Sequence, residues 1–242
     1  MELRICHLYP DLLNLYGDRG NITTLVHRAR WRGITASLIE ARLGDRIDSR
    51  ASDLYFIGGG EDRQQRLASP DLCRVKGGAL RDAAASGAAV LAVCGGYQLL
   101  GHYYRPSDGP DLEGLGLLDL HTVHPGPGAR RLIGNIVIRE RTEGVRLVGF
   151  ENHGGRTHLG PHAEALGTVE SGFGNNGEDR SEGAVTGTVY GTYLHGPLLP
   201  KNPWLADVLI AHALRRRNTG VDLAPLPDVE EHLAAEAAAQ RR

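Results

Sequence analysis

The stretch that decides the fold is Ala89-Val-Leu-Ala-Val-Cys94-Gly95-Gly96-Tyr-Gln-Leu-Leu-Gly101. An unbroken apolar run leads into a cysteine and two glycines, and an amphipathic segment begins directly after them. This order predicts a buried parallel strand, a sharp turn and the start of a helix, the geometry of a nucleophile elbow with Cys in place of Ser. A thiol there lies beside free backbone N–H groups, which favour the thiolate. Two interpretations stay open at this point, a catalytic nucleophile and a buried structural cysteine.

The composition sets the broad class of the protein. The 242 residues, 41 % of them hydrophobic, suffice for one large α/β domain, alone or with an appendage, and exclude wholesale disorder. A net charge of −2 gives no support for nucleic-acid binding. The three cysteines show no C-x-x-C spacing, so we expect neither a disulfide framework nor a metal site. Without a signal-peptide pattern or an apolar run of about 20 residues, a cytoplasmic protein with no transmembrane segment is expected.

The first half of the chain alternates strands and helices. Strands are expected at residues 3–8, 34–39 and 54–57, ahead of the Cys94 strand, and helices at 21–32, capped by Asn21, and from 70 or 71 to about 86. This alternation predicts a mostly parallel central sheet flanked by helices. Gly58–Gly60 and Cys94 both follow a strand, so they should share the crevice outside the carboxyl ends of the sheet.

The second half is rich in short β segments. Antiparallel strands are expected at residues 115–121, 132–138, 145–150, 165–170 and 183–193, and residues 172–179 have the composition of a hairpin or mobile loop. The chain then turns helical at about 204–217 and again at about 228–239. We therefore predict one domain over residues 1–203 and a C-terminal helical extension, 204–242, packed on that domain or on a partner.

A nucleophilic Cys94 needs a general base and a site for the oxyanion. His195 is the best-placed histidine, because it ends the strand-like run 188–194 and is followed by Gly-Pro, although a solvent-facing loop histidine is the alternative. The backbone N–H of Gly95, with one from Gly59 or Gly60, could form the oxyanion hole, unless the glycine run is simply a tight turn. The run lacks a following G-K-[ST], which argues against a nucleotide phosphate site.

The motifs around these residues resemble a known family. Val93-Cys94-Gly-Gly-Tyr-Gln98, together with Tyr193-Leu-His195-Gly-Pro, is similar to class I (triad-type) glutamine amidotransferases of the branch shared with cobyric acid synthases. The GatD type, the glutaminase subunit of lipid II isoglutaminyl synthase, is similar in five further motifs. These are Tyr9-Pro-Asp-Leu-Leu-Asn-Leu-Tyr-Gly-Asp-Arg-Gly-Asn21, Arg131-Leu-Ile-Gly-Asn135, Phe150-Glu-Asn-His-Gly-Gly-Arg-Thr157, Gly174-Asn-Asn176 and His195-Gly-Pro-Leu-Leu-Pro-Lys-Asn202. The resemblance implies a flavodoxin-like amidotransferase fold over residues 1–203.

The resemblance also implies a division of labour between two subunits. This chain would hydrolyse L-glutamine through a Cys94 glutamyl thioester, with His195 as general base and acid, and would itself need no cofactor. A Mur-ligase-like partner of the MurT type, which binds ATP and Mg²⁺, would activate the D-glutamate α-carboxylate of lipid II. Ammonia passing between the two subunits of this heterodimer would then give D-isoglutamine, a step of peptidoglycan biosynthesis.

Two assignments within this family pattern are less direct. Arg131 matches the substrate-binding arginine that precedes an R-[FL]-I-G motif, and an arginine suits a carboxylate, but Arg130 is adjacent. Two solvated arginines are the plain alternative. Pro197 stands where most triad-type enzymes have a glutamate, so Glu151 is a possible third triad member, with Asp18 as a weaker candidate.

Three other functions compete with this interpretation. One is an amidation subunit for another acceptor, such as a cobyrinate, although cobyric acid synthases carry a fused ATP-binding domain for which this chain has no room. Another is a cysteine peptidase or related hydrolase that uses the same Cys/His pair. The third is a non-catalytic glutamine-binding regulator, against which the joint presence of Cys94, His195 and Arg131 argues.

Overall fold

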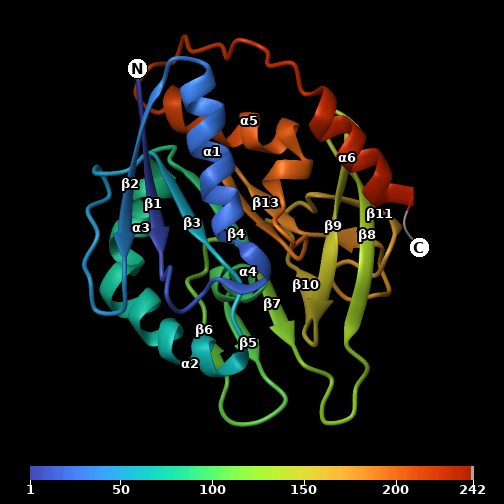
Figure 1. The fold of residues 1–242 in the computed structure, drawn as a ribbon. Coiled ribbons are helices and arrows are strands. Elements are labelled where there is room, and N and C mark those ends of the chain that lie inside the picture. Colours follow the sequence, from blue (N-terminus) through green and yellow to red (C-terminus); the bar gives the residue numbers. More distant parts are fainter. Residues whose placement is uncertain (241–242) are drawn as a thin grey trace.

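The computed structural model describes residues 1–240 and centres on a six-stranded sheet in the order β13-β14-β4-β3-β1-β2 (Figure 1). Its strands are β1 Glu2–Leu8, β2 Thr35–Ala41, β3 Leu54–Ile57, β4 Ala89–Val93, β13 Ala184–Thr186 and β14 Val189–Thr192. All neighbouring strands are parallel except β13, which runs antiparallel to β14. The mostly parallel sheet and its flanking helices confirm the predicted α/β class.

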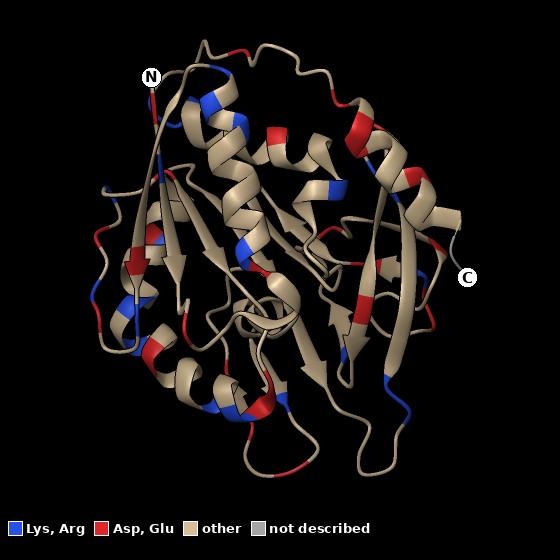
Figure 2. Cartoon of the chain, viewed as in Figure 1, with Lys and Arg blue, Asp and Glu red and all other residues tan. Residues whose placement is uncertain are grey.

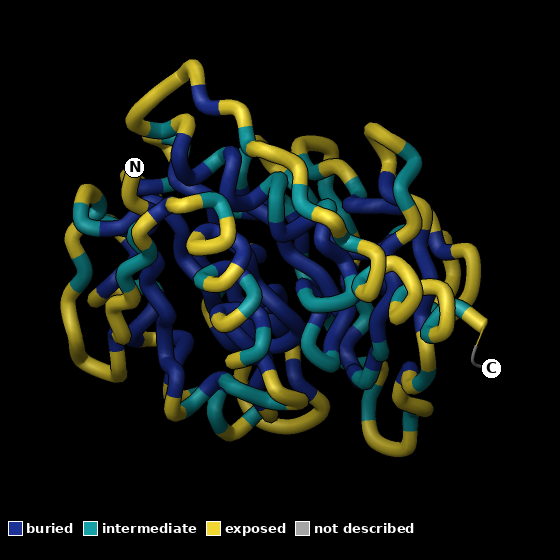
Figure 3. The backbone as a smooth tube through the Cα atoms, turned by 45° about the horizontal axis from the view of Figure 1, so that its top comes forward, coloured by how far each residue is buried: buried dark blue, intermediate teal, exposed yellow. Residues whose placement is uncertain are grey.

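Burial across this sheet follows the position of each strand. Every residue of β3 and β4 is buried, which explains why both read as continuous apolar runs. At the edge, β2 leaves Leu38 and Ile39 exposed, because one of its sides has no neighbouring strand. Figure 3 shows the same division, with the inner strands buried and the outlying loops exposed.

Helices cover the sheet and connect its strands. They are α1 Arg19–Trp31, α2 Asp62–Asp71, a π-helical stretch Leu72–Lys76, α3 Gly77–Ala85, α4 Gly95–Leu100, α5 Pro203–Arg215, α6 Val229–Gln240 and the 3₁₀ turns Leu15–Gly17 and Leu199–Lys201. α5 packs on β1, β3 and β4 and lies beside α1. Its inner face is apolar and buried, with Leu205, Leu209 and Ile210 fully covered.

Two helix starts differ from the predictions. The helix expected from residue 70 or 71 begins at Asp62, and Pro70 lies within it. Because proline cannot donate the helical hydrogen bond, the chain loosens into the π-helical stretch and continues as α3. α1 begins at Arg19, so Asn21 is not its cap; its Oδ1 accepts a hydrogen bond from Leu199 N instead (2.9 Å).

The second half forms two small four-stranded sheets beside the central one. The antiparallel sheet β12-β11-β8-β9 contains β8 Leu132–Glu140, β9 Arg146–His153, β11 Gly167–Ser171 and β12 Ser181–Glu182. The sheet β10-β7-β5-β6 contains β5 Tyr103–Arg105, β6 Leu112–Glu113, β7 Leu120–Val123 and β10 Arg156–Leu159. The strand expected at 115–121 is thus displaced to β7, and the segment 183–193 is a hairpin, β13–β14, that completes the central sheet.

The glycine-rich segment 172–179 is a packed loop. Asn175 is fully buried, and its side-chain oxygen accepts hydrogen bonds from Tyr97 Oη (3.0 Å) and from Gly183 N (3.0 Å). Its amide nitrogen donates to the Gly183 carbonyl (2.9 Å). The composition predicted a hairpin or a mobile loop; the segment contains no strand, and these contacts tie it to α4 and to the β13 side of the sheet.

The C-terminal part leads back over the body of the molecule. A connection without helix or strand runs from α5 to α6, which lies along β8 and β9 with no buried residue of its own (Figure 1). Among the helices of residues 1–240, none combines the length and the apolar character needed to traverse a bilayer. Both acidic and basic residues are scattered over the helices and loops of the ribbon (Figure 2).

Candidate active site

Three neighbouring strands end at the same edge of the central sheet. β4 lies between β3 and β14, with Ala92 opposite Ile57 and Val93 opposite Thr192. Gly58–Gly60 follow β3, Cys94 follows β4, and His195 comes three residues after β14. The structure therefore brings the glycine turn, the thiol and the histidine together in the crevice where parallel sheets bind ligands.

Cys94 occupies a strained turn between β4 and α4. Its φ of 50° and ψ of −107° are unfavourable for a residue with a side chain, and such strain is typical of the nucleophile elbow. The turn also requires glycine, because a Cβ on Gly96 would lie 2.7 Å from Ile57 Cγ2. The sharp turn holds the thiol at the sheet edge, where it is 7 % exposed.

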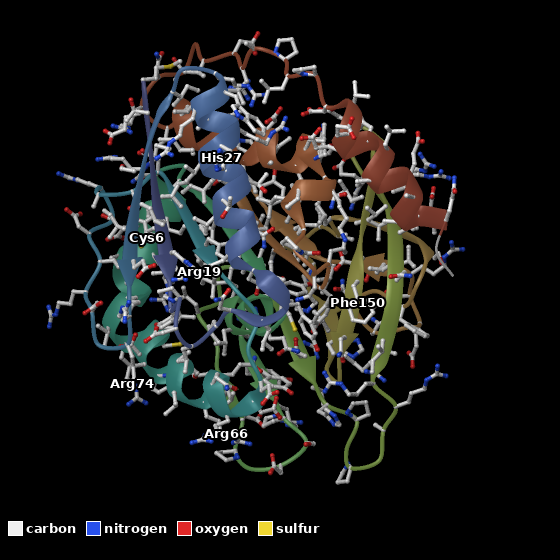
Figure 4. All side chains as sticks on the ribbon, in the orientation of Figure 1. Cys6, Arg19, His27, Arg66, Arg74 and Phe150 are labelled. Carbon is white, nitrogen blue, oxygen red and sulfur yellow. The ribbon has the colours of Figure 1, made fainter. Side chains whose placement is uncertain are left out.

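His195 lies against the same point of the glycine turn as Cys94. A Cβ placed on Gly59 would be 3.2 Å from His195 Cε1 and 3.4 Å from Cys94 Cβ, so both side chains lie close to this glycine. The backbone of His195 pairs with that of Phe150 on β9, which is labelled in Figure 4. His195 is fully buried, and neither ring nitrogen has a hydrogen-bond partner within residues 1–240.

Burial keeps both groups neutral in the resting site. It raises the pKa of the Cys94 thiol to about 12 and lowers the pKa of His195 to about 3. The Gly95 N–H and the Arg131 charge lower the pKa of the thiol, but the effect of burial is larger. The helix start was expected to favour the thiolate; α4 has only six residues, and desolvation outweighs it. A nucleophilic role for Cys94 would therefore require that its proton is transferred during the attack.

A cleft of about 650 Å³ opens beside Cys94. Arg131, the residue directly before β8, lines this cleft. Its Nε donates a hydrogen bond to Asn152 Oδ1 (2.9 Å) and its Nη2 donates one to the Asn152 carbonyl (3.0 Å). Arg130 does not line this cleft, since its guanidinium lies over the Phe173 ring, 5.8 Å from the centroid. Of the two adjacent arginines, the structure thus directs Arg131 toward the thiol.

The predicted oxyanion donors are only partly free. Gly59 N donates to Asp18 Oδ2 at 2.6 Å, so this N–H is already engaged, contrary to the expectation for Gly59. Gly60 lines the cleft, and a Cβ on Gly95 would lie 2.8 Å from Gly60 N. The Gly95 N–H faces the Cys94 thiol. Gly60 and Gly95 remain as the two neighbouring donors.

Glu151 is turned toward another part of the molecule. Its carboxylate accepts hydrogen bonds from Phe173 N (2.6 Å) and Gly174 N (2.9 Å), which anchors the loop after β11. Within residues 1–240 no hydrogen bond joins Glu151 to His195. Glu151 is therefore not positioned as the third triad member, because both of its carboxylate oxygens bind the loop rather than the His195 ring. Its nearest histidine is His153, with Nε2 3.9 Å from Glu151 Oε2.

Several residues around the cleft were not predicted from the sequence. Tyr16 lies edge-on to His195, with 5.0 Å between ring centroids, and its hydroxyl accepts a hydrogen bond from Asn152 Nδ2 (2.6 Å). Gln65 Nε2 donates to the Gly95 carbonyl (3.1 Å) and to Gln98 Oε1 (2.8 Å), which holds the turn after Cys94. Tyr16 stands in a motif quoted above, but its contact depends on a positive φ of 53° that the sequence does not reveal.

The remaining thiols lie elsewhere. Cys6 is buried in β1, in the part of the sheet away from Phe150 (Figure 4), and Cys73 is half-buried in the π-helical stretch. Within residues 1–240, no three His, Cys, Asp or Glu side chains are grouped so that they could hold a metal ion.

The amino-acid sequence is similar to those of two curated proteins. The chain is 45% identical over 224 residues to the lipid II isoglutaminyl synthase subunit GatD of Staphylococcus aureus, covering 93% of this chain and 88% of that protein. It is 39% identical over 237 residues to GatD of Streptococcus pneumoniae, covering 98% and 89%.

A solved structure shares the fold at low sequence identity. PurLQS from Thermotoga maritima superposes with a TM-score of 0.55 at 18% identity, covering 81% of this chain and 88% of that chain. Residues 4–203 match the CobB/CobQ-like glutamine amidotransferase domain. The chain belongs to the CobB/CobQ-like glutamine amidotransferase family.

Proposed function

We propose that this chain is the glutaminase subunit of a lipid II isoglutaminyl synthase, hydrolysing L-glutamine and delivering ammonia to a second subunit. The observation that carries the proposal is that Cys94 and Arg131 line one cleft while the buried His195 lies beside Cys94 at the Gly59 turn, in a chain related to GatD over nearly its whole length. A regulator that merely binds glutamine would have no need of a strained, thiol-bearing elbow beside a histidine.

The proposed reaction starts with Cys94 and His195 both neutral. As Cys94 Sγ attacks the side-chain carbonyl carbon of glutamine, His195 takes the thiol proton, and the N–H groups of Gly60 and Gly95 stabilise the oxyanion. His195 then gives this proton to the departing nitrogen, so ammonia leaves and a γ-glutamyl thioester remains on Cys94. Water, deprotonated by His195, attacks the thioester, and glutamate leaves as the thiol is restored. Arg131 holds the α-carboxylate throughout.

The ammonia acceptor in this proposal lies on a Mur-ligase-like partner of the MurT type. That subunit would bind ATP and Mg²⁺ and activate the D-glutamate α-carboxylate of lipid II, and ammonia would convert it to D-isoglutamine. The GatD relatives are described as subunits of lipid II isoglutaminyl synthase, which supports a heterodimer.

The experiment compares two nitrogen sources in the complex with its partner, supplied with lipid II, ATP and Mg²⁺. With glutamine, we expect the wild-type complex to amidate lipid II and Cys94→Ala to lose amidation by at least about 1000-fold, as removal of a nucleophile does. With ammonium chloride, Cys94→Ala should amidate as well as wild type, because only the ammonia source is lost.

The free thiol Cys73, outside the cleft, provides the matched control. Cys73→Ala should keep glutamine-dependent amidation. If glutamine-dependent amidation survives Cys94→Ala, Cys94 is not the nucleophile. If the wild-type complex amidates lipid II with neither nitrogen source, lipid II is not the ammonia acceptor.

A further inference from the structure

Glutamine is a zwitterion, and a selective site has to recognise both charges on its α-carbon. Arg131 supplies the positive side of the cleft. Two carboxylates also line it, Glu61 and Asp62, at the start of α2. Recognition of the α-ammonium group calls for an anion that is fixed in place before the substrate arrives.

Asp62 is the fixed carboxylate of the two. Its Oδ1 accepts a hydrogen bond from Tyr104 Oη (3.0 Å), and Tyr104 is itself buried at the cleft. Within residues 1–240 the Asp62 carboxylate has no other hydrogen bond, so its second oxygen is available to a ligand. Glu61 is exposed and its carboxylate has no hydrogen bond within the same residues, so binding would have to order a free side chain.

Asp62 and Arg131 both line the cleft that contains the nucleophile. The charge of Arg131 lowers the pKa of the Cys94 thiol and that of Asp62 raises it, which places both within electrostatic reach of the sulfur. Asn152 fixes Arg131 and Tyr104 fixes Asp62, so cation and anion are both held in advance. Arg63, a further cation at the cleft, is exposed.

We propose that Asp62 binds the α-ammonium group of the substrate, so that the cleft selects amides of α-amino acids over simple amides. This inference rests on the proposed glutaminase function. A charge-assisted hydrogen bond from the ammonium to the free oxygen of Asp62 would orient the α-carbon, while Arg131 holds the carboxylate on the same carbon. The side-chain amide then extends toward Cys94.

The test compares L-glutamine with glutaramate, which lacks only the α-amino group, in the complex with its partner. We expect wild type to prefer glutamine strongly. Asp62→Asn keeps an oxygen for Tyr104 but loses the charge, and it should reduce kcat/KM for glutamine about 10- to 100-fold, mainly through KM, as loss of a charged hydrogen bond does. For glutaramate its kcat/KM should stay within about twofold of wild type, since no contact is lost.

Other outcomes separate this inference from its alternatives. Equal losses on both amides would show that Asp62 is structural, and a preference lost in Glu61→Gln but kept in Asp62→Asn would assign the role to the neighbour. Asp108→Asn, on an exposed loop outside the cleft, is the control for the substitution itself. Wild-type protein that hydrolyses neither amide would overturn the proposed function rather than the role of Asp62 within it.

Discussion

Asp18 is a buried carboxylate that organises the glycine turn of the site. Asp18 directly precedes α1, and its Oδ2 accepts a hydrogen bond from Gly59 N. Burial raises the pKa of Asp18 to about 7, partly offset by this hydrogen bond, so the side chain titrates near neutral pH. Its negative charge in turn raises the pKa of Cys94. Asp18 therefore links the stability of the site to pH.

The pH dependence of stability tests this role of Asp18. Because its pKa is higher in the folded than in the unfolded chain, its contribution to stability is present at low pH and is lost as the pH rises toward about 7. Asp18→Asn cannot ionise, so from about pH 4 to about pH 8 the variant should gain on the order of 1–4 kcal/mol relative to wild type. Urea unfolding across this range measures the gain; a constant difference between the two proteins would contradict the assignment.

Residues at strand ends could be predicted, and residues brought in by loops could not. Cys94, His195 and Gly60 converge because adjacent parallel strands end at one edge, which local sequence patterns are sufficient to indicate. The engagement of Gly59 depends on Asp18, forty-one residues earlier in the chain. Glu151 likewise binds the loop at Phe173, a contact with no local signal.

At the scale of elements, one arginine joins three parts of the molecule. Arg28 on α1 is 1 % exposed, and its guanidinium binds Asp207 on α5 (2.7 and 2.8 Å) and Asp228 before α6 (2.6 and 2.9 Å). Arg28 is thus a buried guanidinium held by two bidentate carboxylates. Removing a charged partner from such a buried cluster is strongly destabilising. Because α6 has no buried residue, this cluster is a main attachment of the C-terminal helix.

Removal of this arginine should loosen the C-terminal region. Arg28→Ala leaves Asp228 without this cation and Asp207 with Arg32 alone, and we expect a loss of about 3–5 kcal/mol in the free energy of unfolding. Urea denaturation measures the loss, and Arg30→Ala, exposed on the same helix, should change stability by less than about 0.5 kcal/mol. A similar small effect for both variants would show that the cluster contributes little.

The elements that the sequence predicted well are those with a strong local pattern. β3 and β4 match their apolar runs, and α5 matches its amphipathic segment closely. α2 was missed because its first turns, Asp62–Arg66, are polar and carry no apolar period. The short strands β5, β6, β10 and β12 are defined by pairing with distant partners, so tertiary contacts rather than local propensity create them.

At the scale of the whole molecule, the parallel sheet and the smaller sheets perform different tasks. The central sheet presents Cys94, the glycine turn and His195, whereas Arg131 and Asn152 come from the β8–β9 side. The predicted boundary between residues 203 and 204 stays a prediction, although α5 packs directly on the central sheet. In the proposed reaction, substrate binding and bond cleavage would thus depend on how the second half of the chain is placed against the first.

The central claim is that Cys94 forms a γ-glutamyl thioester, and its most direct test is to trap that species. The wild-type complex is mixed with L-glutamine, quenched in acid during turnover, digested and analysed by mass spectrometry. We expect one γ-glutamyl group on the peptide that contains Cys94, and none on the corresponding peptide of the Cys94→Ala complex. Release of ammonia without any adduct on Cys94, or an adduct on Cys6 or Cys73, would contradict it.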